Sequence, residues 1–477
     1  MSGTADAQLV ARLTAAAVPG APADVEVTAP TAELQVAASL QLTAAVRDAF
    51  ANPVPDPSLA WSSAPADVAS VTQAGLATGF APGMATLTAT AGTASGSVTL
   101  EVVPRPLSPA DVTFTLGTPD VVFDHSADRC EVMDLPDMTA RAVRMPDGSL
   151  VLYSGNAPRA YASYGPDFAS LERSCTPTLV SDDDPTAPSF SNQEWVSTVY
   201  REGGVFHAIV HNEYHDPVHP NCKQGDTSPA NPCWYNGLTY ASSTDGRAFV
   251  QPAPPDHVVA APPQRWDPSG ARAPGPYGYF APSNILRLED GYYYAMFFTI
   301  PDRDDPPKRG SCVMRTSDLA DPGSWRAWDG SAYTVAMPSP YAPAATGVAC
   351  TIVLPYGIDG SLTWNTYLER YLYVGASAAH VDGVLRCGFL FSISEDLVTW
   401  SAPRVLKEAP VTFPPCGSGP NAGREYYPSL IDHAETGLNF ENTGRTPHLY
   451  YMRYNDNALD RDLVRVPLTI GVTSPAH

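Results

Sequence analysis

The sequence predicts an all-β protein in two unequal parts, a β-sandwich followed by a five-bladed β-propeller. The chain has 477 residues, which is too long for one ordinary domain. It contains 49 Pro and 35 Gly, a composition typical of turn-rich β-proteins. Segments that alternate apolar and polar residues recur throughout, and in the larger part they form five similar hairpins.

The first part is expected to be an immunoglobulin-like sandwich over residues 26–104. Strand-like alternation recurs there in "ELQVAASLQLTAAV", "ATLTATAG" and "SGSVTLEVV", and turn-rich pieces such as "NPVPDPS" separate the strands. Residues 1–25 are expected to be a flexible N-terminal segment. Residues 105–119 are expected to be a linker, because three prolines in "VPRPLSP" favour an extended connection.

The short motifs of this part resemble a known module. Leu40–Ala44, Trp61–Ser63, Val68–Val71 and Gly75–Gly79, followed by the stretch 81–87, resemble the bacterial immunoglobulin-like group 2 domain. The resemblance implies a stalk or spacer of the kind found on exported bacterial proteins.

Residues 120–477 are expected to form the propeller. Five segments each have a strand, a turn and a second strand, and three of the turns are Asp-Gly or Gly-Gly, a strong hairpin signal. Third strands follow, as in "GFLFSISEDLVTW", in which an Asp is expected to cap a turn and an aromatic residue to pack into the blade. Five four-stranded units predict a five-bladed propeller. The hairpins are 139–155, 194–215, 280–299, 350–377 and 426–454.

The blade pattern, with "DGYYYAMFF", "RTSDLADPGSWRAW" and "SEDLVTW", resembles the family 43 group of five-bladed propeller glycoside hydrolases. The resemblance implies a glycosidase that requires no cofactor and uses an Asp base, a second Asp that tunes the pKa values, and a Glu acid, each from a different blade. "DLPDMTARAV" matches the first position, so Asp137, or Asp134, is the candidate base. Blades 3 and 4 begin "GYFAPSN" and "TGVAC", without an acid, so the other two positions do not match.

Candidate site residues are therefore chosen by their position at the rim that carries the long loops. The catalytic candidates are Asp137, Glu194 and Glu213, because glycoside hydrolysis needs two carboxyl groups across a sugar ring. Alternatives are a turn-capping role for Asp137, a structural ion pair for Arg424 and Glu425, and blade core for the aromatic residues. The substrate-binding candidates are Asp134, His211, His215, Tyr279, Arg424 and Glu425.

The segment "IVHNEYH" carries His211, Glu213 and His215 on one face of an expected strand. Three interpretations stay open. Glu213 could be a general acid whose pKa the histidines tune. The three side chains could bind a divalent metal, Zn or Ca. They could also form a hydrogen-bonded cluster that closes the rim.

Charge and cysteine content restrict the partners and the location. Asp and Glu number 50 against 28 Lys and Arg, a net charge of −22, which excludes nucleic acid and anionic membrane as partners. The sequence contains no stretch of eighteen apolar residues, the length needed to span a membrane. A monomer is expected. Eight widely spaced cysteines favour disulfides, with Cys222–Cys233 the first pair expected, over buried thiols.

These features predict an exported glycoside hydrolase that cleaves a plant or microbial polysaccharide or oligosaccharide. The expected location is secreted or on a bacterial cell surface, with the expectation that a signal segment has been removed from the mature chain. Two alternatives stay open. One is a polysaccharide lyase that uses His211 or Tyr214 to abstract a proton beside a uronate. The other is a glycan-binding adhesin, which the absence of acids in blades 3 and 4 favours.

Overall fold

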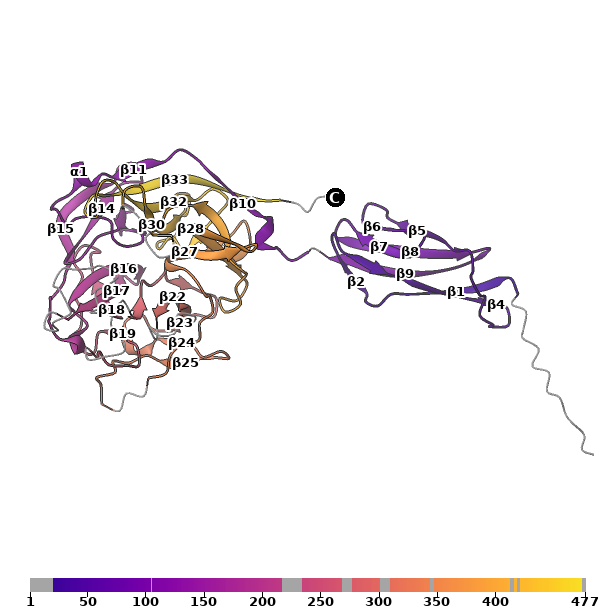
Figure 1. The fold of residues 1–477 in the computed structure, drawn as a ribbon, viewed down its shortest axis with the longest axis horizontal. Coiled ribbons are helices and arrows are strands. Elements are labelled where there is room, and N and C mark those ends of the chain that lie inside the picture. The colour runs from indigo at the N-terminus through magenta and orange to yellow at the C-terminus, as the bar shows by residue number, and fades with distance from the viewer. Residues whose placement is uncertain are drawn as a thin grey trace, which may run out of the picture. The chain divides into compact units, whose positions relative to one another are not determined.

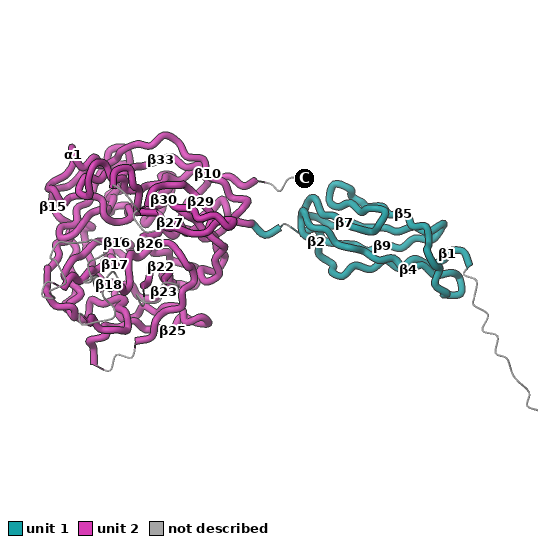
Figure 2. Tube along the Cα trace, viewed as in Figure 1, with its two compact units in different colours: residues 1–107, 474–477 teal, residues 108–473 magenta. Residues whose placement is uncertain are grey.

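A computed structural model describes residues 20–103, 105–216, 234–267, 277–300, 309–343, 347–411, 416–417 and 421–473. The chain divides into two compact units, residues 1–107 with 474–477, and residues 108–473 (Figure 2). Both units consist of β-strands with only short helical turns such as α1 (His125–Asp128), which confirms the all-β prediction. No helix in these described ranges is both long enough and apolar enough to cross a membrane.

Unit 1 is a β-sandwich. Its core contains Leu42, Leu87 and Leu100, which come from the alternating segments of the sequence. One sheet has the order β2-β9-β8-β5, a second has β3-β7-β6, and β1 pairs with β4. The strands are β1 (Pro22–Thr28), β2 (Glu33–Gln35), β3 (Ser39–Gln41), β4 (Thr43–Asp48), β5 (Ala60–Ala64), β6 (Ala69–Val71), β7 (Leu76–Gly79), β8 (Gly83–Ala91) and β9 (Ala94–Val103).

Unit 2 is a five-bladed propeller in which consecutive antiparallel strands run outward from the axis (Figure 1). Blade 1 contains β12 (Arg141–Arg144), β13 (Leu150–Tyr153), β14 (Arg159–Gly165) and β15 (Glu172–Val180). Blade 2 contains β16 (Gln193–Glu202), β17 (Val205–His215), β18 (Trp234–Ser243) and β19 (Val258–Ala260). Blade 3 contains β20 (Tyr277–Phe280), β21 (Leu286–Arg287), β22 (Tyr293–Ile300), β23 (Gly310–Thr316), β24 (Arg326–Trp328) and β25 (Tyr333–Ala336). Blade 4 contains β26 (Ile358–Asn365), β27 (Arg370–Val381), β28 (Val384–Ser394) and β29 (Arg404–Glu408). Blade 5 contains β30 (Glu425–Ile431), β32 (His448–Tyr454) and β33 (Arg461–Val472).

The ring is closed by the start of the propeller segment. β10 (Val112–Leu116) and β11 (Asp120–Phe123) both pair antiparallel with β33 and complete blade 5 (Figure 1). Residues 112–116 thus form a strand although the sequence assigns them to a 105–119 linker. Their alternating pattern "VTFTL" suits a strand, and the prolines that suggest a linker all precede it.

Most predicted turns occur where the sequence places them. Gly148, Gly204 and Gly291 have φ values of 87°, 87° and 83°, as tight hairpin turns require. Asp245 and Asp396 each accept backbone N–H bonds from residues two and three positions later, as expected for capped turns.

The predicted hairpin of blade 4 is misplaced. The Asp359-Gly360 dipeptide lies inside the inner strand β26, and the turn falls at residues 366–369. The segment that begins at Cys350 belongs to the edge of blade 3, where Leu354 pairs with Ser311 and Cys350 forms a disulfide with Cys312.

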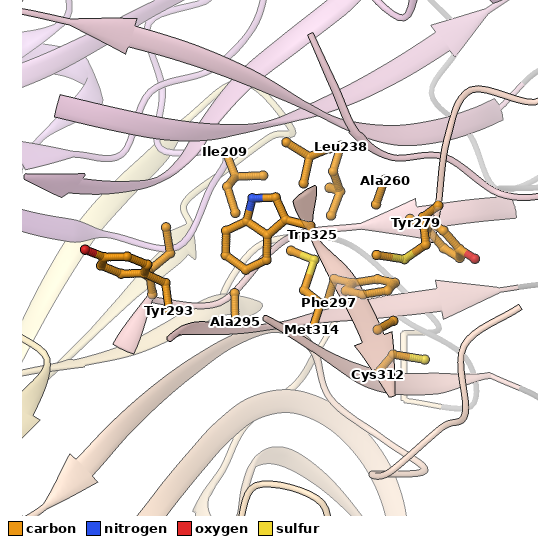
Figure 3. Packing of buried hydrophobic residues seen from close by; sticks show 14 of the residues in the cluster. Ile209, Leu238, Ala260, Tyr279, Tyr293, Ala295, Phe297, Cys312, Met314 and Trp325 are labelled. Atoms are coloured by element: carbon orange, nitrogen blue, oxygen red, sulfur yellow. The ribbon is translucent and has the colours of Figure 1, made fainter. Parts of the chain in front are cut away.

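Aromatic and aliphatic side chains fill the spaces between blades. Trp325 is 2% exposed and packs with Ile209 and Leu238 of blade 2, so blades 2 and 3 share one core (Figure 3). Tyr279 lies in the same core and is 1% exposed. The interpretation of Tyr279 as a substrate-binding residue is therefore replaced by its alternative, blade core.

Residues 432–447 of blade 5 extend across the propeller at the end that carries the tight hairpin turns. The Leu438 carbonyl accepts a bond from the Arg144 N–H of blade 1, and Asn439 bonds to both backbone groups of Arg201 in blade 2. Glu441 accepts bonds from Tyr200 of blade 2 and from the Arg287 N–H of blade 3. β31 (Asn442–Thr443) pairs with β26 of blade 4. One segment therefore contacts all the other blades.

Three disulfides connect described cysteines: Cys130–Cys175, Cys312–Cys350 and Cys387–Cys416. Disulfides, and not buried thiols, are thus the state of these six residues. The expected Cys222–Cys233 pair lies outside the described residues.

Candidate functional site

Strained backbone marks the beginning of three consecutive inner strands. Ala281, Asp359 and Tyr427 have φ values of 38°, 54° and 54°, in the left-handed region that residues with a side chain seldom adopt. They occupy equivalent positions in blades 3, 4 and 5. Such strain persists only where surrounding contacts impose it, and it is concentrated at functional sites.

Asp137 lies just before the first inner strand, β12. It pairs with Arg461, and the Tyr427 hydroxyl donates to its Oδ1 at 3.2 Å. Both bonds fall on Oδ1, so Oδ2 accepts no hydrogen bond from the described residues. Burial raises the pKa of Asp137, Arg461 counteracts that rise, and the charge of Glu213 adds to it.

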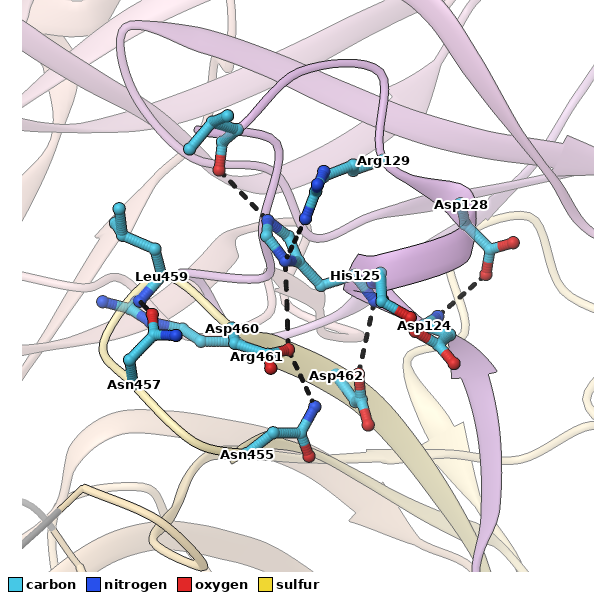
Figure 4. A network of polar contacts seen from close by, with 12 residues as sticks. Asp124, His125, Asp128, Arg129, Asn455, Asn457, Leu459, Asp460, Arg461 and Asp462 are labelled. Atoms are coloured by element: carbon cyan, nitrogen blue, oxygen red, sulfur yellow. Dashed lines mark hydrogen bonds and ion pairs between the residues drawn. The ribbon is translucent and has the colours of Figure 1, made fainter.

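Arg461, in turn, is held by the segment that leads into β33. Its Nε donates to the Ala458 carbonyl at 2.6 Å. Figure 4 shows this segment packed beside α1, where the His125 N–H donates to Asp462 and Asn455 donates to Asp460. The guanidinium is therefore fixed before any ligand arrives.

Glu213 projects from the end of β17 and is held by two histidines. His211 Nε2 lies 3.1 Å from Oε1, and His215 Nε2 lies 3.0 Å from Oε2. The Ala281 N–H donates to His211 Nδ1 at 3.1 Å, so that nitrogen carries no proton and Nε2 is the donor to Glu213. Burial alone would raise the pKa of Glu213, but the two imidazole bonds hold it below its ordinary value.

Asp359 is the carboxyl group of blade 4. Its pKa is raised to about 8, chiefly by burial and also by the charges of Asp137 and Glu213, while the Tyr426 hydroxyl and Arg141 act in the opposite direction. The side chain is therefore protonated at neutral pH. Gly360, the next residue, has no room for a Cβ, which would lie 2.1 Å from the Tyr373 ring.

The three carboxyl groups form one electrostatic cluster from three blades. The charge of Glu213 raises the pKa of Asp137, and the charges of both raise the pKa of Asp359. Their protonation states differ, because Asp359 is neutral and Glu213 is ionised at pH 7. Pairs of carboxyl groups whose environments push their pKa values apart are typical of acid–base catalysis. We call Asp137, Glu213 and Asp359 the carboxyl cluster.

Glu194 does not join the cluster. Its carboxylate accepts a bond from Gln251 at 2.7 Å and from the Asp182 N–H at 3.3 Å, and burial raises its pKa to about 7. Trp195, the next residue on the strand, packs against His211. Because neighbouring residues on a strand point to opposite faces, Glu194 points away from His211 and Glu213.

Two of the predicted rim acids form ion pairs. Asp134 is fully buried, and Arg173 binds it through Nε and Nη2 while the Cys130 N–H donates to it. Glu425 pairs with Lys407. Both carboxylates have a structural partner that a substrate would need to displace.

Arg424 also has protein partners, because its guanidinium donates to Asn421 Oδ1 and to the Gly417 carbonyl.

The contacts of the histidine–glutamate segment bear on its three interpretations. Each histidine points Nε2 at a separate oxygen of Glu213, which matches the hydrogen-bonded cluster. Within the described ranges, no group of three or more His, Cys, Asp or Glu side chains is arranged to hold a metal ion. The lyase bases are engaged as well, because both ring nitrogens of His211 have partners and the Tyr214 hydroxyl donates to the Pro185 carbonyl.

Asp359, Arg461 and Tyr427 were not among the predicted site residues. Asp359 was not considered because the inner strand of blade 4 was expected to begin at "TGVAC", whereas β26 begins at Ile358. The signal that could have located it is the alternating "SLTWN" that follows directly, which predicts a strand starting at this point. Arg461 and Tyr427 carry no local pattern, since they are brought to Asp137 by ring closure.

The described fold and site thus define a five-bladed propeller with a carboxyl cluster, preceded by a sandwich. Residues 23–102 match the family model of the bacterial Ig-like domain (group 2), which confirms the resemblance of the first part. No curated protein sequence matches the chain.

Similar solved structures include enzymes that act on glycans. An endo-arabinase from Bacteroides thetaiotaomicron is 11% identical, with 73% of this chain and 97% of that chain covered and a TM-score of 0.41. A family 117 glycoside hydrolase from Zobellia galactanivorans is 8% identical, with 77% and 95% covered and a TM-score of 0.41. An α-L-arabinanase from Cellvibrio cellulosa is 10% identical, with 69% and 90% covered and a TM-score of 0.39.

Proposed function

We propose that this protein is a glycoside hydrolase that acts outside the cell on a plant or microbial polysaccharide or oligosaccharide. The observation that carries the proposal is the opposed protonation of Asp359 and Glu213 within one carboxyl cluster. Glycosidic bond cleavage needs one carboxyl group that holds a proton and a second that is ionised. Three disulfides fit an oxidising location.

Each member of the cluster has a distinct role in this proposal. Asp359, which is protonated at neutral pH, donates its proton to the leaving oxygen. Asp137, with Oδ2 open, accepts a proton from the attacking water. Glu213, kept ionised by its histidines, stabilises the positive charge that develops on the sugar ring.

The glycan-binding adhesin is the alternative in a different class. Its support was the absence of an acid from blades 3 and 4, and Asp359 removes that support for blade 4. Aromatic side chains at the site, such as Trp195 and Phe280, would serve binding and hydrolysis equally, because they pack against His211 in either case.

The test is turnover of a panel of neutral and acidic polysaccharides, measured as new reducing ends. Asp359→Asn and Glu213→Gln should each lower kcat by about 10²- to 10⁴-fold with the fold intact. Asp382→Asn is the matched control, since Asp382 is an exposed blade-4 acid paired with Arg404. Glu194→Gln should keep most of the activity, because Glu194 lies outside the cluster.

Retention on an affinity gel of the same glycans separates binding from hydrolysis. Binding without turnover by the wild-type protein would indicate the adhesin. An unsaturated product, detected by its ultraviolet absorbance, would indicate a lyase.

A further inference from the structure

Arg141 is a charged side chain buried near the propeller axis. It lies on β12 of blade 1 and is 3% exposed, and no carboxylate of the described residues bonds to it. Its Nη2 instead donates to the Gly360 carbonyl of blade 4 at 2.8 Å and to the Pro282 carbonyl of blade 3 at 3.3 Å. Burying an unpaired guanidinium is costly, so a residue in this place calls for an explanation.

The contacts of Arg141 converge on the backbone that presents Asp359. The Gly360 carbonyl belongs to the residue that follows Asp359, and Thr139 Oγ1 donates to the carbonyl of Asp359 itself at 3.1 Å. Two side chains of blade 1 therefore hold two consecutive carbonyl groups of β26 in blade 4, those of Asp359 and Gly360. The φ of 54° at Asp359 is a conformation that relaxes unless neighbours impose it.

We infer that Arg141, together with Thr139, is a positioning residue for Asp359, holding the strained Asp359-Gly360 backbone of β26 so that the carboxyl group points into the cluster. This inference rests on the proposed function for its meaning in catalysis, although the positioning itself does not depend on it. The Pro282 bond places the same guanidinium against blade 3, next to Ala281, whose N–H orients His211.

The charge of Arg141 has a second effect, on the proton of Asp359. Burial lowers the pKa of Arg141 to about 9, so it remains a cation at neutral pH. A cation beside a carboxyl group favours ionisation, which opposes the effects of burial and of the neighbouring carboxylates. The charged and titratable groups that face Asp359 are Asp137 before β12, Arg141 on β12, Glu213 on β17, Tyr373 on β27, and Tyr426 and Tyr427 on β30.

The experiment measures Asp359 directly in the full-length protein. The infrared carbonyl stretch of a protonated carboxylic acid that disappears in Asp359→Asn identifies the group, and its loss with rising pH gives the titration midpoint. Arg141→Gln should move this midpoint upward by about one pH unit, a tenfold gain in proton affinity, and should lower kcat. Thr139→Val should broaden the same band and lower kcat at unchanged KM, with the midpoint kept.

Arg144→Gln is the matched control. Arg144 lies on the same strand, and its guanidinium also donates to backbone carbonyls, those of Gly148 and Glu435, but at the tight-turn end of the blades. It should change neither the midpoint nor kcat.

An unmoved midpoint in a folded Arg141→Gln protein would overturn the inference. If that variant does not fold, an unchanged band and kcat in Thr139→Val would overturn it. A shifted midpoint in a protein that cleaves no glycan would leave the positioning role standing and reject the proposed function instead.

Discussion

Arg461 at the start of the last strand pairs with Asp137 before the first inner strand, although 324 residues separate them in the chain. The pairing exists because β33 and β11 close the ring in blade 5. The proposed base is therefore completed only when the propeller is closed.

Removal of this arginine should shift the pH dependence of activity. Arg461 lowers the pKa of Asp137 against the effect of burial, so Arg461→Gln should raise that pKa by about one to two units. Asp137 must be ionised to act as a base, so the acid limb of kcat/KM should move to higher pH by the same amount. Tyr427→Phe, which removes one neutral hydrogen bond, should shift the limb in the same direction by less. An acid limb that stays in place would exclude Asp137 as the base.

Ionisation of Asp359 should reduce both activity and stability as the pH rises. Its folded pKa, about 8, lies above the ordinary value of 3.8, so the native state holds one more proton than the unfolded state between these values. The contribution of Asp359 to the free energy of unfolding is fully present below about pH 4. It is lost as the pH rises toward 8, on the order of 1 kcal/mol per pH unit. Asp359→Asn should flatten this decline in urea unfolding measured from pH 5 to 9. The variant shows how the other titrating groups affect stability. If the wild-type protein has the same pH dependence of unfolding free energy as Asp359→Asn from pH 5 to 9, the raised pKa of Asp359 is contradicted.

The buried pair of Asp134 and Arg173 should be important for stability and not for catalysis. Both side chains are almost inaccessible, at 0% and 4%. Arg173→Met leaves a buried carboxylate without its cation and should cost about 3–5 kcal/mol in urea unfolding. The double variant Asp134→Asn, Arg173→Met should recover part of that loss, because no charge is then buried. If the single and double variants lose the same free energy, the pair does not interact as described.

Asn439 should stabilise the propeller from the end opposite the carboxyl cluster. Its amide bonds to the N–H of Arg201 at 2.7 Å and to the carbonyl of Arg201 at 3.1 Å. Asn439→Ala leaves both backbone groups without these partners and should cost about 1–3 kcal/mol. Asn439→Asp keeps the acceptor and should cost less. Activity per folded molecule should stay constant in both variants, as measured by turnover normalised to the folded fraction.

The fold was predictable because its information is local. Alternation defines strands and Gly-containing turns define hairpins, so blades 1, 2 and 3 were placed correctly around Gly148, Gly204 and Gly291. Blade 4 was misplaced because its inner strand was expected to begin at "TGVAC", and β26 begins only at Ile358. The pairing of β10 with β33 joins opposite ends of the segment, and no local pattern encodes it.

The site was predictable only in part for the same reason. Asp137 and Glu213 lie at strand ends that local patterns locate, whereas the third carboxyl group depends on the register of blade 4. Side-chain orientation also distinguishes residues that look alike in the sequence. Glu194 and Glu213 both lie at strand ends of blade 2, but the pleat sends them to opposite faces.

Residues 432–447 bond to blades 1, 2, 3 and 4 from their origin in blade 5. A ring built only from neighbour-to-neighbour contacts can come apart one sheet at a time, like a stack of repeats. Here residues 432–447 bond to the sheets of all four other blades, so separating any one of these blades breaks bonds to a segment that the others also contact. The 366-residue propeller unit should accordingly melt in one cooperative step.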